Sequence, residues 1–168
     1  MSVLCDMDLY FQVKSFQSFE TSLLQELEYE KWLNIFSDDL RYRAPLVSVT
    51  DHRAGSLSNS TDLMLYDDSF ETLKLRVARA KSKRAWTETP PSRLRYFIDP
   101  IEIKEEGDAL VVVSNMIIYQ TRLQREENLF IGQRTDRIRR AEDQWAVFDR
   151  FAVIDRTVLP SKNLTVFF

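Results

Sequence analysis

The residues of this 168-residue chain that could hold a metal or attack a substrate are few. His52 is the single histidine and Cys5 the single cysteine. A non-haem iron site needs two histidines and a carboxylate, and iron–sulfur or multi-thiolate zinc sites need several cysteines or histidines. This sequence has neither set of ligands, and it has no Gly-x-Gly-x-x-Gly motif for a dinucleotide. We therefore expect no catalytic residue, no cofactor-binding residue and no metal ligand in this chain.

Acid–base chemistry by histidine or tyrosine is the remaining alternative. His52 lies in a polar, turn-rich stretch, residues 51–61, and a histidine in such a loop is more often solvated than catalytic. Tyrosines paired with aspartates can move protons in an open pocket. The candidates for such pairs are Tyr42, Tyr66, Tyr96 and Tyr119 with Asp38 or Asp99. Amphipathic aromatic side chains that fill a core are the more common explanation, and the sequence alone leaves both open.

Length and composition place the chain among ordinary globular domains. It is 44% hydrophobic and 29% charged, and its length fits one domain over residues 1–168. The first dozen residues have neither a basic start nor a continuous apolar stretch. We therefore expect no secretory signal, no membrane contact and a cytoplasmic location.

Basic residues gather in two places although the net charge is −3. One group lies within residues 74–84, and the other comprises Arg134, Arg137, Arg139 and Arg140. Such clusters occur in proteins that bind nucleic acids. Asp and Glu are interspersed throughout this chain, and the pI is about 5.3. We therefore expect ion pairs within or between subunits and no nucleic-acid partner.

The first part of the chain predicts two helices followed by a strand. In residues 16–36 the apolar positions change phase near Glu28, which predicts two short helices, the second reaching Phe36. The residues expected to share the buried face of the first helix are Phe16, Phe19, Leu23 and Leu27. Residues 40–44 then alternate as a half-buried strand that Pro45 ends.

The remainder predicts strands joined by turns. They are expected over residues 63–66, 94–103, 109–122, 128–139 and 145–159. A change of parity at Asp99-Pro100 predicts a β-bulge or sharp bend, and Asn115 in an apolar run is expected to be a buried, bonded amide. Phe167 and Phe168 are expected to dock in the core or an interface. This pattern predicts an α+β fold in which a curved, largely antiparallel sheet wraps around the N-terminal helices.

Residues 66–103 form the most distinctive stretch. Asp68 and Glu71 match a capping box, which predicts the start of a basic helix. Its apolar stripe at helical spacing consists of Phe70, Leu73, Val77 and Ala80. Pro90 and Pro91 cannot continue a helix, so they predict a rigid corner before the next strand.

This stretch resembles the signature region of the small (β) subunit of Rieske-type aromatic ring-hydroxylating dioxygenases. The matching residues are Tyr66, Asp67, Asp68, Leu73, Arg76, Trp86, Glu88, Pro90, Pro91, Ser92, Arg93 and Arg95. Further residues that fit the family are Trp32, Leu33, Asp39, Tyr42, Pro45, Ser114, Asn115, Tyr119, Arg122, Asp155, Thr157, Val158, Leu159, Asn163, Leu164, Phe167 and Phe168. Asp149 and Arg156 depart from the family pattern.

The resemblance implies the nuclear-transport-factor-type (SnoaL-like) cone fold and a non-catalytic, structural subunit of a terminal oxygenase. Such an oxygenase converts aromatic hydrocarbons to cis-dihydrodiols with O2 and NADH-derived electrons. The substrate expected here is biphenyl or a polycyclic aromatic hydrocarbon. The catalytic α subunit would carry the Rieske [2Fe–2S] cluster and the mononuclear non-haem iron, in a hexamer of three α and three β subunits. Ferredoxin would act on this chain only indirectly, through the α subunit. The alternative is a stand-alone cone-fold isomerase or dehydratase with its own small-molecule pocket.

Three residues of the signature stretch are candidates for the subunit interface: Trp86, Arg93 and Arg95. Trp86 stands between the basic helix and the two prolines, where it could anchor a contact. The two arginines alternate with Leu94 and Tyr96, so they should project from the face opposite the core. Since Trp and Arg dominate interface energetics, we expect these residues to meet a neighbouring α or β subunit.

Overall fold

A six-stranded curved sheet with three helices makes up the computed structural model, which describes residues 6–45, 64–87, 92–122, 126–142, 144–155 and 166–168. For residues 83–87 and 126 the description is limited to the backbone. In chain order the elements are α1 (Met7–Gln25), α2 (Tyr29–Leu33), β1 (Phe36–Pro45), β2 (Met64–Ser69), α3 (Phe70–Thr87), β3 (Arg93–Glu106), β4 (Ala109–Arg122), β5 (Glu126–Ala141) and β6 (Gln144–Ile154).

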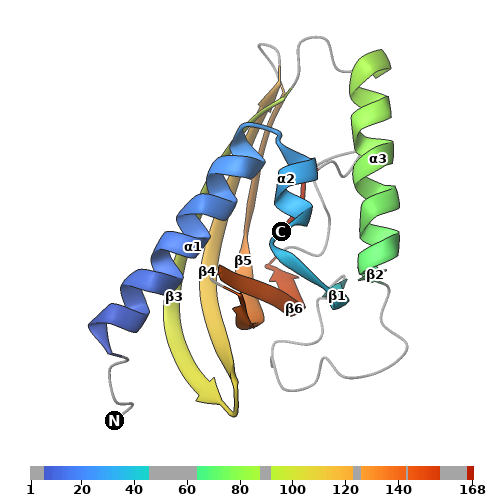
Figure 1. The fold of residues 1–168 in the computed structure, drawn as a ribbon. Coiled ribbons are helices and arrows are strands. Elements are labelled where there is room, and N and C mark those ends of the chain that lie inside the picture. The colour runs from blue at the N-terminus through green and yellow to red at the C-terminus, as the bar shows by residue number, and fades with distance from the viewer. Residues whose placement is uncertain (1–5, 46–63, 88–91, 123–125, 143, 156–165) are drawn as a thin grey trace.

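The strands lie in the order β2-β1-β6-β5-β4-β3. All neighbours are antiparallel except β1 and β6, which pair in parallel. Figure 1 shows α1 running along the long strands β3 and β4, α2 over the middle of the molecule, and α3 beside β1 and β2. The α+β architecture and the largely antiparallel, curved sheet predicted from the sequence are thus confirmed.

Helix α1 protects the open edge of strand β3. The side-chain oxygen of Gln25 accepts a hydrogen bond from the Tyr96 N–H at 3.2 Å. Lys14 Nζ donates to the carbonyl of Ile98 at 2.9 Å and pairs with Asp99 at 2.6 Å. Backbone groups of an edge strand would otherwise be free to pair with another chain, so these contacts close one end of the sheet.

The helical break and three of the four residues expected on the buried face were predicted correctly, but Phe19 and one helix end were not. Leu27 has φ +62° between α1 and α2, which stops the first helix. The face of α1 that is buried consists of Val13, Gln17, Glu20, Leu23 and Leu24, whereas Phe19 is 53% exposed. The chain leaves α2 after Leu33, and Phe36 already pairs with Val147 of β6, so backbone pairing replaces the helix expected to reach Phe36.

The start of α3 differs from the predicted capping box. Asp68 belongs to β2, and its carboxylate accepts hydrogen bonds from Arg76 at 2.7 and 3.2 Å instead of capping the helix. Ser69 takes the capping role, since its hydroxyl accepts from the Thr72 N–H at 3.3 Å. The predicted apolar stripe is confirmed, with Leu73 and Val77 buried.

Two features of the long strands explain the curvature of the sheet. The β3–β4 register shifts between Pro100 and Glu102, which confirms the predicted bulge. At Gly132 of β5, a Cβ atom would lie 2.0 Å from the Val153 carbonyl oxygen of β6, so only glycine permits this close approach. Asn115 is exposed on β4 rather than buried, because its parity places it on the face opposite Ser114 and Met116.

The core lies between the concave face of the sheet and the helices. Its largest members include Trp32, Tyr42, Tyr66, Phe130, Phe167 and Phe168. Phe167 and Phe168 are at most 2% exposed, which confirms that they dock in the core. The last strand was predicted to reach Leu159; β6 ends at Ile154, and residues 156–165 lie outside the described part of the chain.

Candidate functional site: a filled cone and an exposed sheet face

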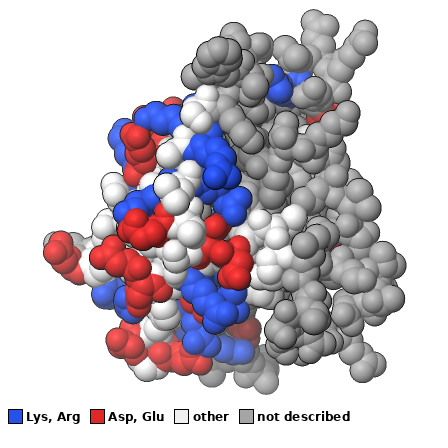
Figure 2. All heavy atoms as spheres, turned by 90° about the vertical axis from the view of Figure 1, so that its right-hand side faces the viewer, with Lys and Arg blue, Asp and Glu red and all other residues white. Residues whose placement is uncertain are grey.

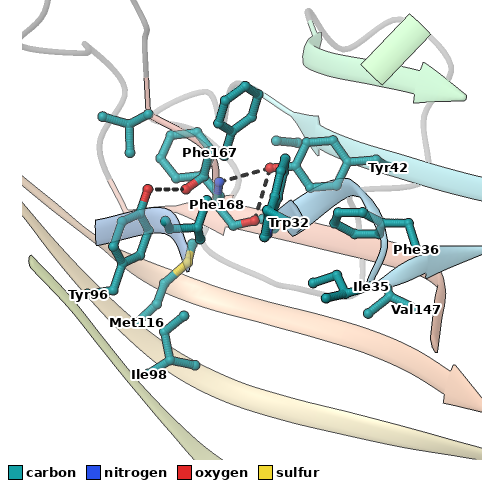
Figure 3. Packing of buried hydrophobic residues seen from close by; sticks show 14 of the residues in the cluster. Trp32, Ile35, Phe36, Tyr42, Tyr96, Ile98, Met116, Val147, Phe167 and Phe168 are labelled. Carbon is teal, nitrogen blue, oxygen red and sulfur yellow. Dashed lines mark hydrogen bonds between the residues drawn. The ribbon is translucent and has the colours of Figure 1, made fainter. Parts of the chain in front are cut away.

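The interior of the cone brings together three tyrosines from three strands. Tyr42 of β1, Tyr66 of β2 and Tyr96 of β3 are 0%, 1% and 6% exposed. Each hydroxyl donates a hydrogen bond to the backbone of residues 166–168. Figure 3 marks the bonds of Tyr42 and Tyr96. Burial raises the pKa of all three phenols well above the ordinary value, so they stay protonated and act as donors.

The tyrosine–aspartate pairs considered from the sequence do not form. Asp38 is exposed, and Asp99 is also exposed and is paired with Lys14 at 2.6 Å. Tyr119 pairs in register with Arg95, so it lies on the face of the sheet opposite Tyr96. The aromatic filling of the cone, the second explanation for these residues, accounts for Tyr42, Tyr66 and Tyr96. His52 lies outside the described residues.

Beside the tyrosines lies a buried charge network consisting of Glu20, Arg134, Asp136 and Arg150. Their exposed fractions are between 0% and 2%. Asp136 of β5 and Arg150 of β6 are direct register partners, and Arg150 Nε donates to Asp136 Oδ1 at 2.6 Å. Glu20 projects from α1 and accepts from Arg150 at 2.6 Å and from Arg134 at 2.5 Å. The network contains two positive and two negative charges and is therefore neutral.

The electrostatics of the network follow from this pairing. Burial alone would raise the pKa of Glu20, but the charges of Arg134 and Arg150 outweigh it and hold the pKa at about 2. Burial would lower the pKa of Arg150, but the charges of Asp136 and Glu20 raise it above the ordinary value. Glu20 and Arg150 are therefore charged at neutral pH, and neither is poised to exchange a proton.

Acidification is expected to destabilise the chain through Glu20. Its pKa falls from 4.5 to about 2 on folding. A carboxyl group whose pKa is lower in the folded state stabilises that state above the ordinary pKa, and this contribution disappears as the pH falls from about 4.5 towards 2. The expected loss is about 3 kcal/mol, measurable by urea unfolding at a series of pH values. The Glu20→Gln variant should lack this component; an acid-dependent loss of equal size in that variant would assign it to other carboxylates.

Sequence reasoning missed this network. Glu20 falls on one helical face with Val13, Gln17 and Leu24, a spacing that could have marked it as buried. In β5, Arg134 and Asp136 alternate inwards. Arg137 and Arg139 point outwards, where Arg137 pairs with Glu106 at 3.3 Å and Arg139 with Asp39 at 2.6 Å.

The opposite, convex face of the sheet exposes apolar side chains. Phe97, Ile117 and Ile131 of β3, β4 and β5 are direct register partners and are 62%, 41% and 42% exposed. We refer to these three residues as the outer apolar row. Leu129 of β5 lies next to it and is 38% exposed. An apolar row that crosses three strands is larger than the single exposed hydrophobic residues found on most monomers.

Two of the three predicted interface residues lie on this face. Arg93 and Arg95 are exposed on β3, on the same face as Phe97, as their alternation with Leu94 and Tyr96 predicted. Arg95 donates to the carbonyl of Leu94 at 3.0 Å. The backbone of Trp86 belongs to the last turn of α3 rather than to a turn after it, and its side chain lies outside the description.

A groove of about 430 Å³ lies between α1 and β3. Its lining includes Lys14, Gln17, Tyr96, Phe97 and Asp99. Lys14 and Asp99 neutralise each other, and the Tyr96 hydroxyl is bonded to Phe167. These lining residues therefore offer no free acid–base pair to a small molecule.

The surface around α3 carries mixed charge. Figure 2 shows Lys and Arg next to Asp and Glu on this side of the molecule. Lys74 pairs with Glu71 at 2.7 Å, and Lys81 of α3 pairs with Glu30 of α2 at 2.7 Å. These pairs, like those of the arginines on β5, agree with the prediction of ion pairing rather than a basic surface for nucleic acid.

Within the described ranges, no three His, Cys, Asp or Glu side chains come together as a possible metal site. Among the helices described, none has the length and apolar character required to span a membrane.

Solved structures with the same fold include oxygenase subunits and proteins of other kinds. A chain of naphthalene 1,2-dioxygenase, solved with indole bound in the active site, matches over 99% of this chain and 89% of its own, with a TM-score of 0.85 and 22% identity. The β subunit of benzoate 1,2-dioxygenase from Burkholderia mallei matches over 90% of this chain and 92% of its own, with a TM-score of 0.71 and 20% identity. ActVI-ORFA from Streptomyces coelicolor matches over 89% and 98%, with a TM-score of 0.63 and 12% identity. Together they define the SnoaL-like cone fold.

The fold alone does not distinguish an oxygenase subunit from the other proteins that share it, but a family model does. The model of the ring-hydroxylating β subunit matches residues 19–161, which is most of the chain. The chain therefore belongs to the ring-hydroxylating dioxygenase β subunit family. The resemblance seen in residues 66–96 is thereby confirmed.

Proposed function

We propose that this chain is a non-catalytic, structural β subunit of the terminal oxygenase of an aromatic ring-hydroxylating dioxygenase. The chain belongs to this family, and the observation that supports a non-catalytic role is that its own residues fill the interior of the cone. Residues 166–168 fill the cone and accept the hydrogen bonds of the three tyrosine hydroxyls, and the neutral charge network lies beside them. A cone-fold isomerase or dehydratase would need that interior for its own substrate.

The ligand inventory supports the same division of labour. A Rieske cluster is held by two cysteines and two histidines, whereas this chain has one of each. The residues present therefore do not fit either iron centre, and we assign the Rieske cluster and the mononuclear iron to a catalytic α subunit. Ferredoxin would deliver NADH-derived electrons to that α subunit in the cytoplasm.

The surface that would meet the other subunits is proposed to be the convex face of β3, β4 and β5. The outer apolar row supplies buried area, and Arg93 and Arg95 supply charged hydrogen-bond donors at its side. Trp86 is proposed to add to a contact near the end of α3. We propose a hexamer of three α and three β subunits as the assembled form.

The substrate of the complex is proposed to be an aromatic hydrocarbon, biphenyl or a polycyclic aromatic, which the complex converts with O2 to a cis-dihydrodiol. Similar structures come from dioxygenases of naphthalene and benzoate. The substrate pocket would lie in the α subunit, so this chain would support assembly and stability.

Iron analysis and turnover of separated and combined subunits test this function. The purified chain alone should retain no stoichiometric iron and should form no dihydrodiol. Addition of a Rieske-type α subunit with its ferredoxin and reductase should give turnover. Stoichiometric iron in the isolated chain, or isomerase or dehydratase activity without any partner, would favour the stand-alone enzyme.

A further inference from the structure

Residues 166–168 are held in the cone by side chains rather than by a strand partner. They belong to no helix or strand. The Tyr66 hydroxyl donates to the Val166 carbonyl at 2.7 Å, the Tyr96 hydroxyl to the Phe167 carbonyl at 2.9 Å, and the Tyr42 hydroxyl to the Phe168 carbonyl at 3.0 Å. Three consecutive carbonyls are thus each bonded by a tyrosine from a different strand.

Two further hydrogen bonds complete the contacts at Phe168. Its N–H donates to the Tyr42 hydroxyl oxygen at 2.8 Å. Arg150 donates to its carbonyl oxygen at 3.2 Å, which connects the segment to the buried charge network.

The two aromatic rings of the segment fill separate apolar positions. The Phe167 ring lies 4.8 Å from the Trp32 ring and 5.2 Å from the Tyr29 ring, measured between centroids. The Phe168 ring lies 5.8 Å from Tyr66 and 5.9 Å from Phe130. The Trp32 contact is tilted and the other three are edge-to-face, and aromatic contacts of these kinds add to the apolar burial of each ring.

We propose that the cone interior is a peptide-binding site for an aliphatic–aromatic–aromatic segment, and that residues 166–168 occupy it as a tethered ligand. Peptide-binding sites combine hydrogen bonds to the backbone with pockets for individual side chains, and both are present here. A strand of the core would instead pair its backbone with a neighbouring strand. The proposed peptide site consists of residues of this chain alone, so it does not depend on contacts with other subunits.

A tethered ligand should leave its site separately from the rest of the fold. Native-state hydrogen exchange of the full-length chain measures this at the Phe168 N–H. We expect this amide to exchange through a local opening, with a protection factor at least about tenfold lower than the protected amides of β4 and β5. Exchange of the Phe168 amide only together with those amides, by global unfolding, would show that the segment does not leave its site separately and would overturn the proposal.

The site should also accept the segment in trans. A chain that ends at Thr165 is mixed with acetyl-Val-Phe-Phe-amide at millimolar concentration, the range that a short tether provides. We expect saturable binding and recovery of thermal stability, and about a hundredfold weaker binding of acetyl-Val-Ala-Ala-amide, because two phenyl rings are lost. If the shortened chain neither binds the aromatic peptide nor folds in its presence, the proposal is wrong.

A tyrosine variant separates recognition from general stability. In the shortened chain, Tyr96→Phe should lower the affinity for the aromatic peptide about fivefold or more, because the peptide carbonyl that corresponds to that of Phe167 loses its donor. Tyr119→Phe, on the other face of the sheet, is the matched control and should leave the peptide affinity unchanged. Equal affinities in both variants would contradict recognition of the backbone by the tyrosines.

Discussion

Replacing Glu20 with glutamine is expected to lower the free energy of unfolding by about 3–5 kcal/mol, because it removes one of the two carboxylates that neutralise the buried arginines. Glu20 accepts hydrogen bonds from Arg134, Arg150 and the Trp32 indole, at 2.5, 2.6 and 3.1 Å. Glutamine keeps the size of the side chain but gives the network a net positive charge in a site without solvent. Urea unfolding of the isolated chain measures the loss.

Glu30→Gln is the matched control for this variant. Glu30 pairs with Lys81 at 2.7 Å, but both side chains are more than half exposed. Exposed pairs of this kind contribute about 0–1 kcal/mol, so the control should unfold almost as the unsubstituted chain does. If Glu20→Gln costs no more than Glu30→Gln, the buried charge network does not hold the helix and the sheet together.

Replacing Phe97 with aspartate is expected to weaken subunit association at least about thirtyfold, the effect of losing an interface hot spot of about 2 kcal/mol. Phe97 is 62% exposed in the isolated chain and occupies one end of the outer apolar row. The unfolding free energy of the isolated chain should therefore change by only about 0.5 kcal/mol. Titration of an α subunit with this chain, followed by light scattering, measures the association.

Two further variants define this surface. Arg95→Ala should also weaken association, because it leaves a carboxylate of the neighbouring subunit unpaired. Leu75→Asp is the matched control, since Leu75 is 67% exposed on α3, away from the outer apolar row. Association that weakens with Leu75→Asp and not with Phe97→Asp would place the interface on α3. If Arg95→Ala melts the isolated chain, Arg95 belongs to an internal ion pair.

Periodic apolar patterns predicted most of the elements, because burial of one face leaves a regular trace in the sequence. The stripe of α3, the strand of β4 and the bulge at Pro100 all follow from such patterns. The residue that caps α3 was harder to predict, because two neighbouring residues can take this role. Asp68 and Ser69 are both good helix caps, and the choice between them depends on Arg76, which takes the Asp68 carboxylate eight residues later.

The interior of the cone was only partly predictable. Docking of Phe167 and Phe168 followed from their hydrophobicity, but their partners come from five strands and from α2. Glu20 and Arg150 are 130 residues apart in sequence, and charged residues usually mark the surface. Their burial becomes visible only when α1 is packed on the face of the sheet into which Arg150 of β6 points. By contrast, the outward direction of Arg93 and Arg95 followed from simple strand alternation.

Native mass spectrometry of this chain co-expressed with a Rieske-type α subunit from the same organism tests the central claim most directly. The account predicts one complex that contains both chains in equal number, with the mass of three α and three β subunits. It also predicts that Phe97→Asp shifts the spectrum towards separate chains. Recovery of the unsubstituted chain free of any α subunit, under conditions in which both are folded, would contradict the assignment of this protein as an oxygenase subunit.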